Sequence, residues 1–395
     1  MNERMISRKQ AERIVLDSAR QIDVERVGID EALGRALAQD VASDIDMPPF
    51  DKSAMDGYAC RRADLKAQLD VIETIPAGKE PTSAIGPGKC AKIMTGAMVP
   101  EGADCVIMKE YVEVIDERTV RFVGKDTATN ICFLAEDTSV GDVVLRKGES
   151  IKPQHIAILA SLGCTSPLVY RRPNVGIVAT GDELVEPTEK PGASQIRNSN
   201  SYQLVAQVRA AGAIPHYYGI AGDNEEAIDS LFKAALAVND VVLISGGVSV
   251  GDYDLVPGVM RRNGVELLFE SIAMKPGKPT HFGASASTFC FGLPGNPVST
   301  FVVFELLVRP FLLKMMGHEF IAPNVLMPLN EAIEKRRTKR EAWFPVLLTT
   351  EGTVKPVEYH GSAHARALPQ ADGLICLSAG VNRFEAGTIV HVRQI

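Results

Sequence analysis

Residues 240–254 read DVVLISGGVSVGDYD, an apolar run that ends in a serine, three glycines and two aspartates. Such a run is typical of a buried parallel strand, and a glycine-rich turn at its carboxyl end is where open α/β sheets bind ligands. Gly246 and Gly247 carry no side chains, so backbone N–H groups can approach an anion closely. Asp252 and Asp254 place carboxylates beside that anion, which predicts a bridging divalent cation.

The same design recurs at two neighbouring places. Residues 174–180 (NVGIVAT) and 288–292 (TFCFG) are apolar runs that each end in a polar, glycine-bearing loop. The candidate ligand-binding residues of the three loops are Gly181, Asp182, Glu183, Ser245, Gly246, Gly247, Ser249, Pro294, Asn296 and Pro297. Residues 274–279 (MKPGKP) add two lysines on a proline-stiffened turn. Each loop alone is compatible with an ordinary turn. Together they predict an anion site at one sheet edge.

Composition limits the class of protein. A chain of 395 residues with 46% hydrophobic and 23% charged residues is expected to form two to four globular domains. A net charge of −7 disfavours nucleic acid as a partner. No apolar run reaches the ~18 residues that span a membrane, and the opening MNERMISRKQ lacks a signal-peptide core, so we expect a cytoplasmic protein. Seven cysteines without a C-x-x-C pair argue against structural zinc or a disulfide framework.

Periodicity changes along the chain and predicts four parts. A capping box at Ser7 begins a helix to about residue 21, and a second short helix is expected over 30–38. We expect a multi-domain α/β plus β protein, with a three-layer domain on a mostly parallel sheet, a small inserted β domain and a C-terminal β-barrel-like domain. The predicted boundaries are 1–47 with 138–172 (helix and connector), 48–137 (small β), 173–322 (α/β) and 323–395 (C-terminal β).

A second reactive loop enters the small β domain. Residues 50–59, FDKSAMDGYA, hold two acids, a lysine, a serine and a tyrosine in one glycine-bearing turn. Loops of this composition are often functional, although a solvated domain-linking turn explains it equally well. Further on, Thr95 in a small-residue turn is a candidate hydroxyl donor to an oxyanion.

Five motifs occur in a familiar order: FDKSAMDGYA, ATGDELVEP, SGGVSVGDYD, MKPGKP and GLPGNPVS. In these motifs the chain resembles, over essentially its whole length, the molybdopterin molybdenumtransferase family, which comprises the bacterial MoeA proteins and the gephyrin E domain. The resemblance implies a homodimer whose cleft is shared between subunits. It also implies that adenylylated molybdopterin binds with Mg²⁺, that its phosphoanhydride is cleaved, and that AMP leaves while molybdate is placed on the dithiolene sulfurs. Contact with other molybdenum cofactor biosynthesis proteins is a further expectation.

The resemblance also implies roles for individual residues. Lys275 and Lys278, with Pro279 and Ser299, resemble a molybdate pocket. The implied metal or phosphate-side acids are Asp223 and Asp252. The acids implied to be essential for turnover are Asp56 and Glu183, the substrate-contacting hydroxyl is Thr95, and a basic residue that reaches the cleft is Arg366. Simpler readings remain for two of the acids: Asp223 as the N-cap of a helix from residue 224, and Asp182 as the support of its own turn.

Two positions depart from the family pattern. Ser271 stands where a basic residue is common, four positions before Lys275. The family tends to carry an arginine-rich run followed by Gly-Glu-Asp in the segment between the small β domain and the connector. Residues 132–137 (CFLAED) keep the two acids of that pattern but have neither the arginines nor the glycine. If those cations gather molybdate or bind the pterin phosphate, this chain binds its substrates more weakly or uses another cation.

Three other functions are weighed against molybdenum insertion. Molybdopterin adenylyltransferases typically consist of the α/β domain alone, so the extra β domains disfavour that activity. A non-catalytic molybdopterin-binding or scaffold protein of the same fold is disfavoured because the acids and both lysines are retained. A dinucleotide enzyme is disfavoured because the glycines at 246, 247 and 251 do not follow G-x-G-x-x-G.

Overall fold

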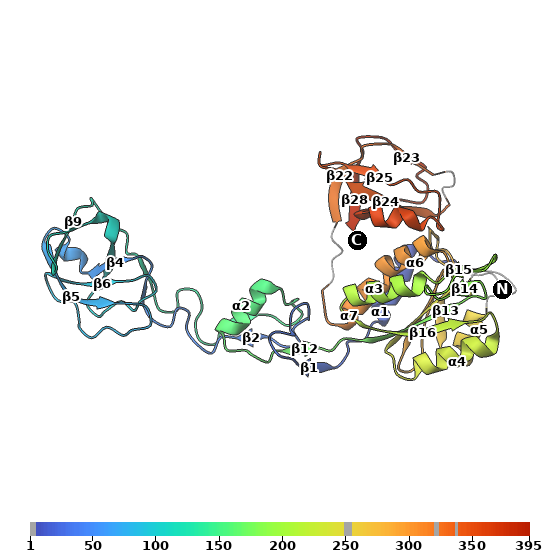
Figure 1. Ribbon diagram of the computed structural model, residues 1–395, viewed down its shortest axis with the longest axis horizontal. Helices are drawn as coiled ribbons and strands as arrows, with labels where there is room; N and C mark the ends of the chain where they lie inside the picture. Colours follow the sequence, from blue (N-terminus) through green and yellow to red (C-terminus); the bar gives the residue numbers. More distant parts are fainter. Residues whose placement is uncertain (1–4, 249–254, 320–323, 336–338) are drawn as a thin grey trace.

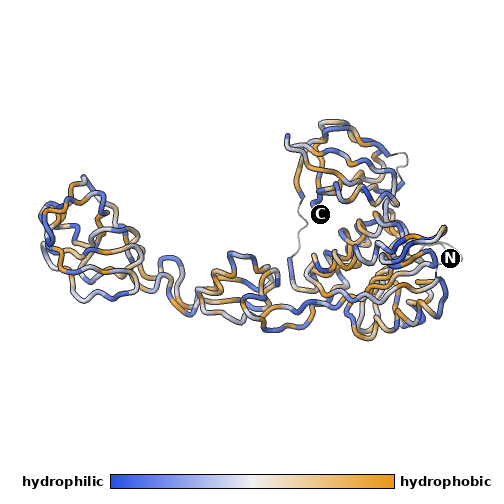
Figure 2. Tube along the Cα trace, in the orientation of Figure 1, coloured by the Kyte–Doolittle hydropathy of each residue, from blue (hydrophilic) through white to orange (hydrophobic). Residues whose placement is uncertain are grey.

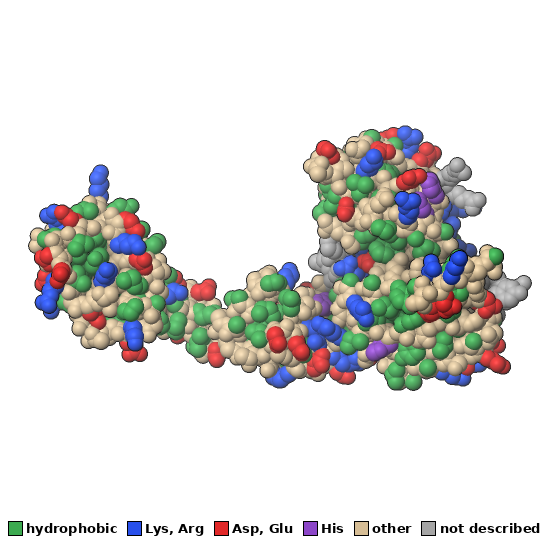
Figure 3. Space-filling model, viewed as in Figure 1, with side chains coloured by type: hydrophobic (Ala, Val, Ile, Leu, Met, Phe, Trp, Pro, Cys, Tyr) green, Lys and Arg blue, Asp and Glu red, His purple; other side chains and the backbone are tan. Residues whose placement is uncertain are grey.

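The computed structural model describes residues 5–248, 255–319, 324–335 and 339–395. The chain is elongated, with a distal lobe at one end, a narrow connector, and central and C-terminal lobes stacked at the other end (Figures 1 and 3). The predicted multi-domain α/β plus β architecture is confirmed. No helix within the described ranges is both long enough and apolar enough to cross a bilayer.

The central lobe is built on a six-stranded mixed sheet in the order β16-β13-β17-β21-β20-β18. The first four strands run parallel to one another, and β20 and β18 pair antiparallel. In chain order the strands are β13 (Asn174–Thr180), β16 (Ile214–Ala221), β17 (Val241–Ser245), β18 (Glu266–Phe269), β20 (His281–Ala284) and β21 (Phe289–Leu293). The predicted mostly parallel sheet therefore has an antiparallel edge.

Helices cover both faces of this sheet and make the predicted three layers (Figure 1). Alternate residues of β13 separate the two cores, because Ile177 packs in one cluster and Val178 in the other. The helices on one face are α1 (Arg8–Ser18), α3 (Asn200–Ala210), α6 (Pro297–Val303) and α7 (Arg309–Met315). A π-helical turn, η3 (Phe304–Val308), joins α6 to α7. The helices on the other face are α4 (Glu225–Leu236) and α5 (Val256–Arg262). Apolar stretches follow these strands and helices in Figure 2.

The distal lobe is a second six-stranded sheet, in the order β7-β4-β6-β5-β9-β8. Its strands are β4 (Gly57–Cys60), β5 (Gln68–Ile75), β6 (Lys89–Ile93), β7 (Cys105–Met108), β8 (Val112–Val114) and β9 (Thr119–Phe122). The chain enters and leaves through a short antiparallel pair formed by β3 (Lys52–Ser53) and β10 (Ile131–Cys132). Strands and turns dominate this region, as the loss of helical periodicity predicted.

The connector consists of two passes of the chain. Its elements are β1 (Val24–Arg26), β2 (Val41–Ala42), β11 (Val143–Leu145), α2 (Pro153–Ser161) and β12 (Leu168–Tyr170). The predicted helix over 30–38 is wrong. Gly34 adopts φ +77°, and the N–H groups of Leu37 and Ala38 donate to Glu149 O and Leu168 O, across to the returning chain. Hydrogen bonds to the returning chain therefore take the place of the bonds between successive turns that a helix would need.

The first helix is shorter than predicted but begins where expected. The Ser7 side chain accepts from the Gln10 N–H, and the Gln10 side chain accepts from the Ser7 N–H, which completes the capping box. The helix ends at Ser18, whose hydroxyl donates to Ile14 O at 2.7 Å, and Ala19 is extended.

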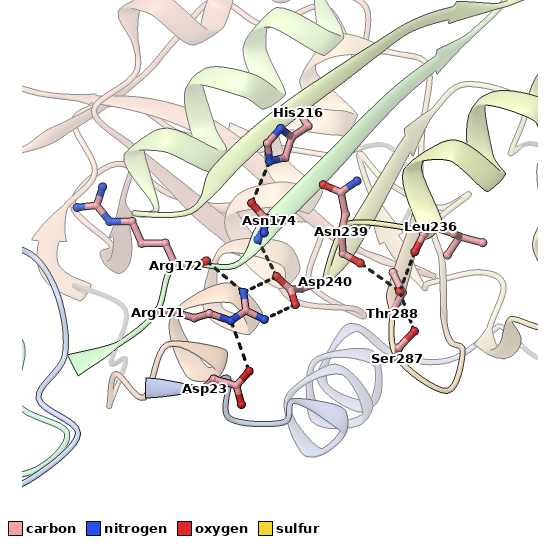
Figure 4. Close-up of polar contacts among 10 residues, drawn as sticks. All are labelled: Asp23, Arg171, Arg172, Asn174, His216, Leu236, Asn239, Asp240, Ser287 and Thr288. Carbon is pink, nitrogen blue, oxygen red and sulfur yellow. Dashed lines mark hydrogen bonds and ion pairs between the residues drawn. The ribbon is translucent and has the colours of Figure 1, made fainter. Parts of the chain in front are cut away.

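A bidentate ion pair between Arg171 and Asp240 joins the connector to the central sheet, directly before the start of β17 (Figure 4). Arg171 lies 2.6 and 2.8 Å from the two carboxylate oxygens of Asp240, which also accepts from the Asn174 N–H. Burial would raise the pKa of Asp240, but the bonds from Arg171 and Asn174 outweigh it and the pKa is lowered. This ion pair therefore fixes the connector to the start of β17, the strand that leads into the glycine loop.

The C-terminal lobe is a β domain, as predicted. Its largest sheet has the order β19-β24-β26-β28-β22, with β25 on β24. Its strands are β22 (Asn324–Pro328), β24 (Glu341–Leu348), β25 (Val354–Pro356), β26 (Gly373–Leu377) and β28 (Ile389–Gln394), and a further pair is β23 (Ile333–Glu334) with β27 (Arg383–Phe384). The edge strand β19 (Met274–Lys275) belongs to the central part of the sequence.

Candidate active site

A cavity of about 660 Å³ opens at the carboxyl ends of β13, β17 and β21. This is the edge at which parallel α/β sheets bind ligands, and the volume is in the range of small-molecule sites. Ten of the predicted site residues line it: Gly181, Glu183, Asp223, Ser245, Gly246, Gly247, Pro279, Pro294, Asn296 and Pro297. The three strand-end loops therefore converge, as the sequence predicted.

The first two glycines of the central loop serve close packing. Both have positive φ, and a Cβ on Gly246 would lie 2.4 Å from Thr180 O. A Cβ on Gly247 would lie 3.0 Å from Thr180 Oγ1. The Gly246 N–H donates to Leu293 O at 3.1 Å, so this amide is engaged within the sheet and does not face a ligand. These glycines let the loops after β13, β17 and β21 approach one another.

Asn200, at the start of α3, ties two of these loops together. Its amide nitrogen lies 2.9 Å from Ser245 Oγ, 2.7 Å from Gly295 O and 3.4 Å from Thr300 Oγ1. Because Ser245 ends β17 and Gly295 follows β21, one side chain sets the spacing of both loops. The N-termini of α3 and α6 meet at the cavity through Asn200 and Pro297, and helix N-termini favour anions.

Two carboxylates stand on neighbouring loops at the cavity. Asp223 and Asp182 exchange bonds, since the Asp182 N–H donates to the Asp223 carboxylate at 3.3 Å and the Asp223 N–H donates to the Asp182 carboxylate at 3.0 Å. Asn224, rather than Asp223, caps α4. The Asp182 carboxylate therefore supports the neighbouring loop at Asp223 rather than its own turn, while Asp223 and Glu183 line the cavity.

The donor chemistry at the cavity is compatible with Mg²⁺. Asp223 and Glu183 offer hard carboxylate oxygens of the kind that magnesium prefers. Within the described ranges, no cluster of three or more potential ligands forms a preassembled metal site. Asp252, Asp254 and Ser249 lie outside the described residues.

The lysine turn lies beside the cavity. Pro279 lines it, whereas the exposed Lys275 and the half-buried Lys278 are not among its described lining residues. The Gly277 carbonyl accepts from the Thr280 hydroxyl, and a Cβ on Gly277 would lie 2.6 Å from Val303 on α6, so the turn packs tightly against that helix. The turn is therefore rigid in its backbone.

Ser299, predicted for the molybdate pocket, and Arg366, predicted to reach the cleft from the last domain, have different surroundings. Ser299 is buried within α6, in the helix whose N-terminus faces the cavity. Arg366 is exposed on η4 (Ala365–Gln370) of the C-terminal lobe. The segment before it reaches the cavity, because Ala363 lines it and Ser362 O accepts from the Val298 N–H.

Asp56 and Thr95 lie elsewhere, in the distal lobe, where Asp56 lines a second cavity of about 270 Å³. The Thr95 N–H and the Thr95 hydroxyl both donate to the same carboxylate oxygen, Asp56 Oδ1, at 2.9 Å. Lys109 Nζ donates to the other oxygen, Asp56 Oδ2, at 3.2 Å. The Thr95 backbone bond, the Thr95 hydroxyl and Lys109 lower the pKa of Asp56 to about 2. Asp56 is therefore a fixed negative charge near neutral pH.

The two departures from the family pattern have structural consequences. Ser271 is buried and its carbonyl accepts from the Ile6 N–H. Phe133 and Leu134 are about half exposed, at 50% and 51%. Ala135, at the position where the resemblance leads us to expect glycine, adopts φ +60°, a region that favours glycine.

Residues that the sequence analysis did not select complete both cavities. Arg197, Asn198, Ser199 and Asn200 line the main cavity, and Lys109 holds Asp56. The available signal was the polar run RNSN immediately before an apolar helix, which reads locally as a helix start.

Matches to known proteins extend over nearly the whole chain. Residues 6–163 match the model of the MoeA N-terminal region (domain I and II), residues 176–314 a probable molybdopterin binding domain, and residues 328–395 the MoeA C-terminal region (domain IV). A molybdopterin molybdenumtransferase of Bacillus subtilis is 34% identical over 98% of this chain and 93% of its own length. One of Staphylococcus aureus is 32% identical over 97% of this chain and 94% of its own. The crystal structure of the molybdopterin biosynthesis MoeA protein from Pyrococcus horikoshii OT3 superposes with a TM-score of 0.86 at 31% identity, covering 99% of this chain and 100% of that one. The chain belongs to the MoeA family.

Proposed function

We propose that this chain is a molybdopterin molybdenumtransferase, which inserts molybdate into adenylylated molybdopterin with release of AMP in molybdenum cofactor biosynthesis. The observation that carries the proposal is the cavity at the strand ends, formed by the family's own motif loops in a chain that matches transferases of that name along nearly its whole length. The chain is thus a transferase whose substrate is related to molybdopterin.

The main cavity is proposed to hold the phosphoanhydride. The N-termini of α3 and α6 supply partial positive charge at its wall, and Arg197 adds a full one. Asp223, together with Asp252 and Glu183, would hold Mg²⁺, which when bound neutralises charge on the phosphates. Asn200 keeps the loops in register around the substrate.

Molybdate is proposed to bind at the lysine turn. Lys275 and Lys278 present two ammonium groups on a backbone that packs against α6, which suits a tetrahedral oxyanion. Pro279 joins this turn to the cavity wall. Ser299 on α6 is assigned to the same pocket, and Arg366 to the cleft from the C-terminal lobe. The dithiolene sulfurs belong to the substrate, so no protein thiol takes part.

Asp56 and Thr95 support a site shared between two subunits. They lie in the distal lobe, which the connector holds apart from the central cavity of the same chain (Figure 3). If these residues serve turnover, the distal lobe of a second copy must approach the cavity, so we propose a homodimer. The low pKa of Asp56 fits a role in orienting a cation or a donor group, since a carboxylate ionised near neutral pH does not deliver a proton.

The test is AMP release from adenylylated molybdopterin with Mg²⁺, with and without molybdate. Molybdate-dependent AMP release together with metal-loaded pterin supports the transferase. Tight pterin binding without turnover would instead identify a binding or scaffold protein. Lys275→Ala should weaken the molybdate dependence more than pterin binding, and Asp252→Asn should slow AMP release in a folded protein.

A further inference from the structure

Residues 271–273, which directly precede the strand that carries Lys275, pair with Ile6 near the start of the chain. The Ile6 N–H donates to Ser271 O at 3.2 Å, and the Ala273 N–H donates to Ile6 O at 2.7 Å. Ile6 and Ile272 form a parallel bridge. Ile6, which precedes the Ser7 N-cap of α1, thus pairs with residues 271–273 in the manner of a neighbouring strand.

The next residues along the chain, which form β19, are held by the C-terminal lobe. β19 pairs in parallel with the start of β24, so that Met274 is opposite Glu341 and Lys275 is opposite Ala342. The Glu341 N–H donates to Ala273 O at 3.3 Å, and Arg340 Nη1 donates to Met274 O at 3.4 Å. Ile6 and the start of β24 therefore pair with consecutive parts of the segment that leads into the lysine turn.

A shielded ion pair locks these two outer segments together. Arg8 Nε on α1 lies 2.8 Å from Glu341 Oε1 on β24, and the two side chains are only 12% and 16% exposed. Trp343 Nε1 donates to the same Glu341 oxygen at 3.0 Å, and the Arg8 guanidinium carbon lies 5.6 Å from the centre of the Trp343 ring. Low exposure strengthens such charge and cation–π contacts.

We infer that Arg8, Glu341 and Trp343 form a clamp whose role is to position Lys275 for molybdate, an inference that rests on the function proposed above. Lys275 is exposed, and nothing among the described residues bonds its ammonium group, so its position depends on the backbone of β19. That backbone is held by β24, and the residues just before it by Ile6, so the Arg8–Glu341 contact ties together the two segments that pair with this part of the chain. The clamp residues are positioning residues and touch no substrate.

The experiment uses the full chain and compares Glu341→Gln with Arg13→Gln. Glu341→Gln keeps shape and an acceptor for Trp343 but removes the charge that joins Arg8 to β24, while the Arg8–Glu12 ion pair within α1 remains. Arg13 lies on the same helix and pairs with Asp17 at 3.6 Å, but those side chains are 84% and 69% exposed, so its loss leaves the clamp intact. For each variant, the rate of AMP release is measured as a function of molybdate and of adenylylated molybdopterin. The concentration of each that gives half the maximal rate is then compared.

Glu341→Gln is expected to raise the molybdate concentration at half-saturation by about ten-fold, since removing a coupling contact without touching the ligand has effects of this order. Half-saturation for adenylylated molybdopterin should be unchanged, which separates positioning from general loss of folded protein. Arg13→Gln should match the parent chain in both. Equal molybdate dependence in a folded Glu341→Gln protein would overturn the inference.

Trp343 supplies a readout besides activity, because it is the only tryptophan in the chain. Molybdate alone, titrated into the parent protein, should change its emission at lower concentration than in Glu341→Gln. If Glu341→Gln fails to fold by circular dichroism, Arg8→Lys tests the same clamp, because it keeps the charge but loses the planar group over the ring. Arg8→Lys should raise the molybdate half-saturation by about three-fold, and no shift would refute the clamp. Absence of molybdate-dependent AMP release in the parent chain would instead refute the proposed function.

Discussion

Asn200→Ala is the substitution that most directly tests how the cavity is built. The amide nitrogen contacts Ser245 Oγ, Gly295 O and Thr300 Oγ1, and its two hydrogens can satisfy two of these acceptors at once. A typical net contribution is about 1 kcal/mol per hydrogen bond, so alanine should lower the free energy of unfolding by about 2 kcal/mol. Gly295 is exposed, so water replaces the lost donor there and adds no further penalty.

Asn263→Ala is the matched control. Asn263 ends α5, is half-buried, and donates to the Asp229 carboxylate at 2.6 Å and to Val259 O at 2.9 Å. It does not line the cavity. Urea unfolding should therefore show losses of about 2 kcal/mol for both variants. AMP release should fall by about ten- to a hundred-fold for Asn200→Ala alone, because small displacements of positioning loops have effects of this size on rate.

The two variants together make the reasoning refutable. If Asn200→Ala and Asn263→Ala lose stability equally and also retain equal rates of AMP release, Asn200 is a structural residue and the loop spacing is set by packing. If Asn200→Ala is as stable as the parent protein, the three contacts contribute nothing and the geometric account of the cavity is wrong.

Three other perturbations give distinct outcomes. Ala135→Gly should raise the free energy of unfolding by about 1 kcal/mol in urea titrations, because φ +60° is strained for alanine; a loss would show that the side chain's packing matters more. Lys109→Met should raise the pKa of Asp56 above about 2 in a carbon-13 carboxyl titration, yet leave it below the ordinary value because Thr95 still donates twice; an unchanged value would exclude the ion pair as a cause. Asp240→Asn should cost about 2 kcal/mol of stability at pH 7. Since the pKa of Asp240 is lowered on folding, that difference should be present above the unfolded value of about 3.9 and shrink as the pH falls below it; a difference independent of pH would contradict this.

Short-range patterns predicted most of the central lobe. The run before Gly246 became β17, the capping box at Ser7 began α1, and the alternation of strands and helices gave three layers. Each of these signals depends on neighbours within one helical turn or one strand. The failure over residues 30–38 has the opposite cause, because Leu37 and Ala38 donate to residues more than a hundred positions away. Lateral pairing of this kind leaves no local periodicity.

Long-range contacts also explain which site residues escaped prediction. Asn200 acts through groups 45 to 100 positions further along the chain, and Lys109 reaches Asp56 across 53 positions. Locally, each is an ordinary polar residue beside a secondary-structure element. Gly246 is the opposite case, because local sequence locates it at the site but does not predict its role. Its amide bonds to Leu293 O and not to a ligand, and its missing side chain makes room for Thr180. A glycine loop at a strand end therefore predicts where a site lies better than it predicts which groups contact the ligand. Those groups have to be sought on the helix starts and polar runs that the loops bring together.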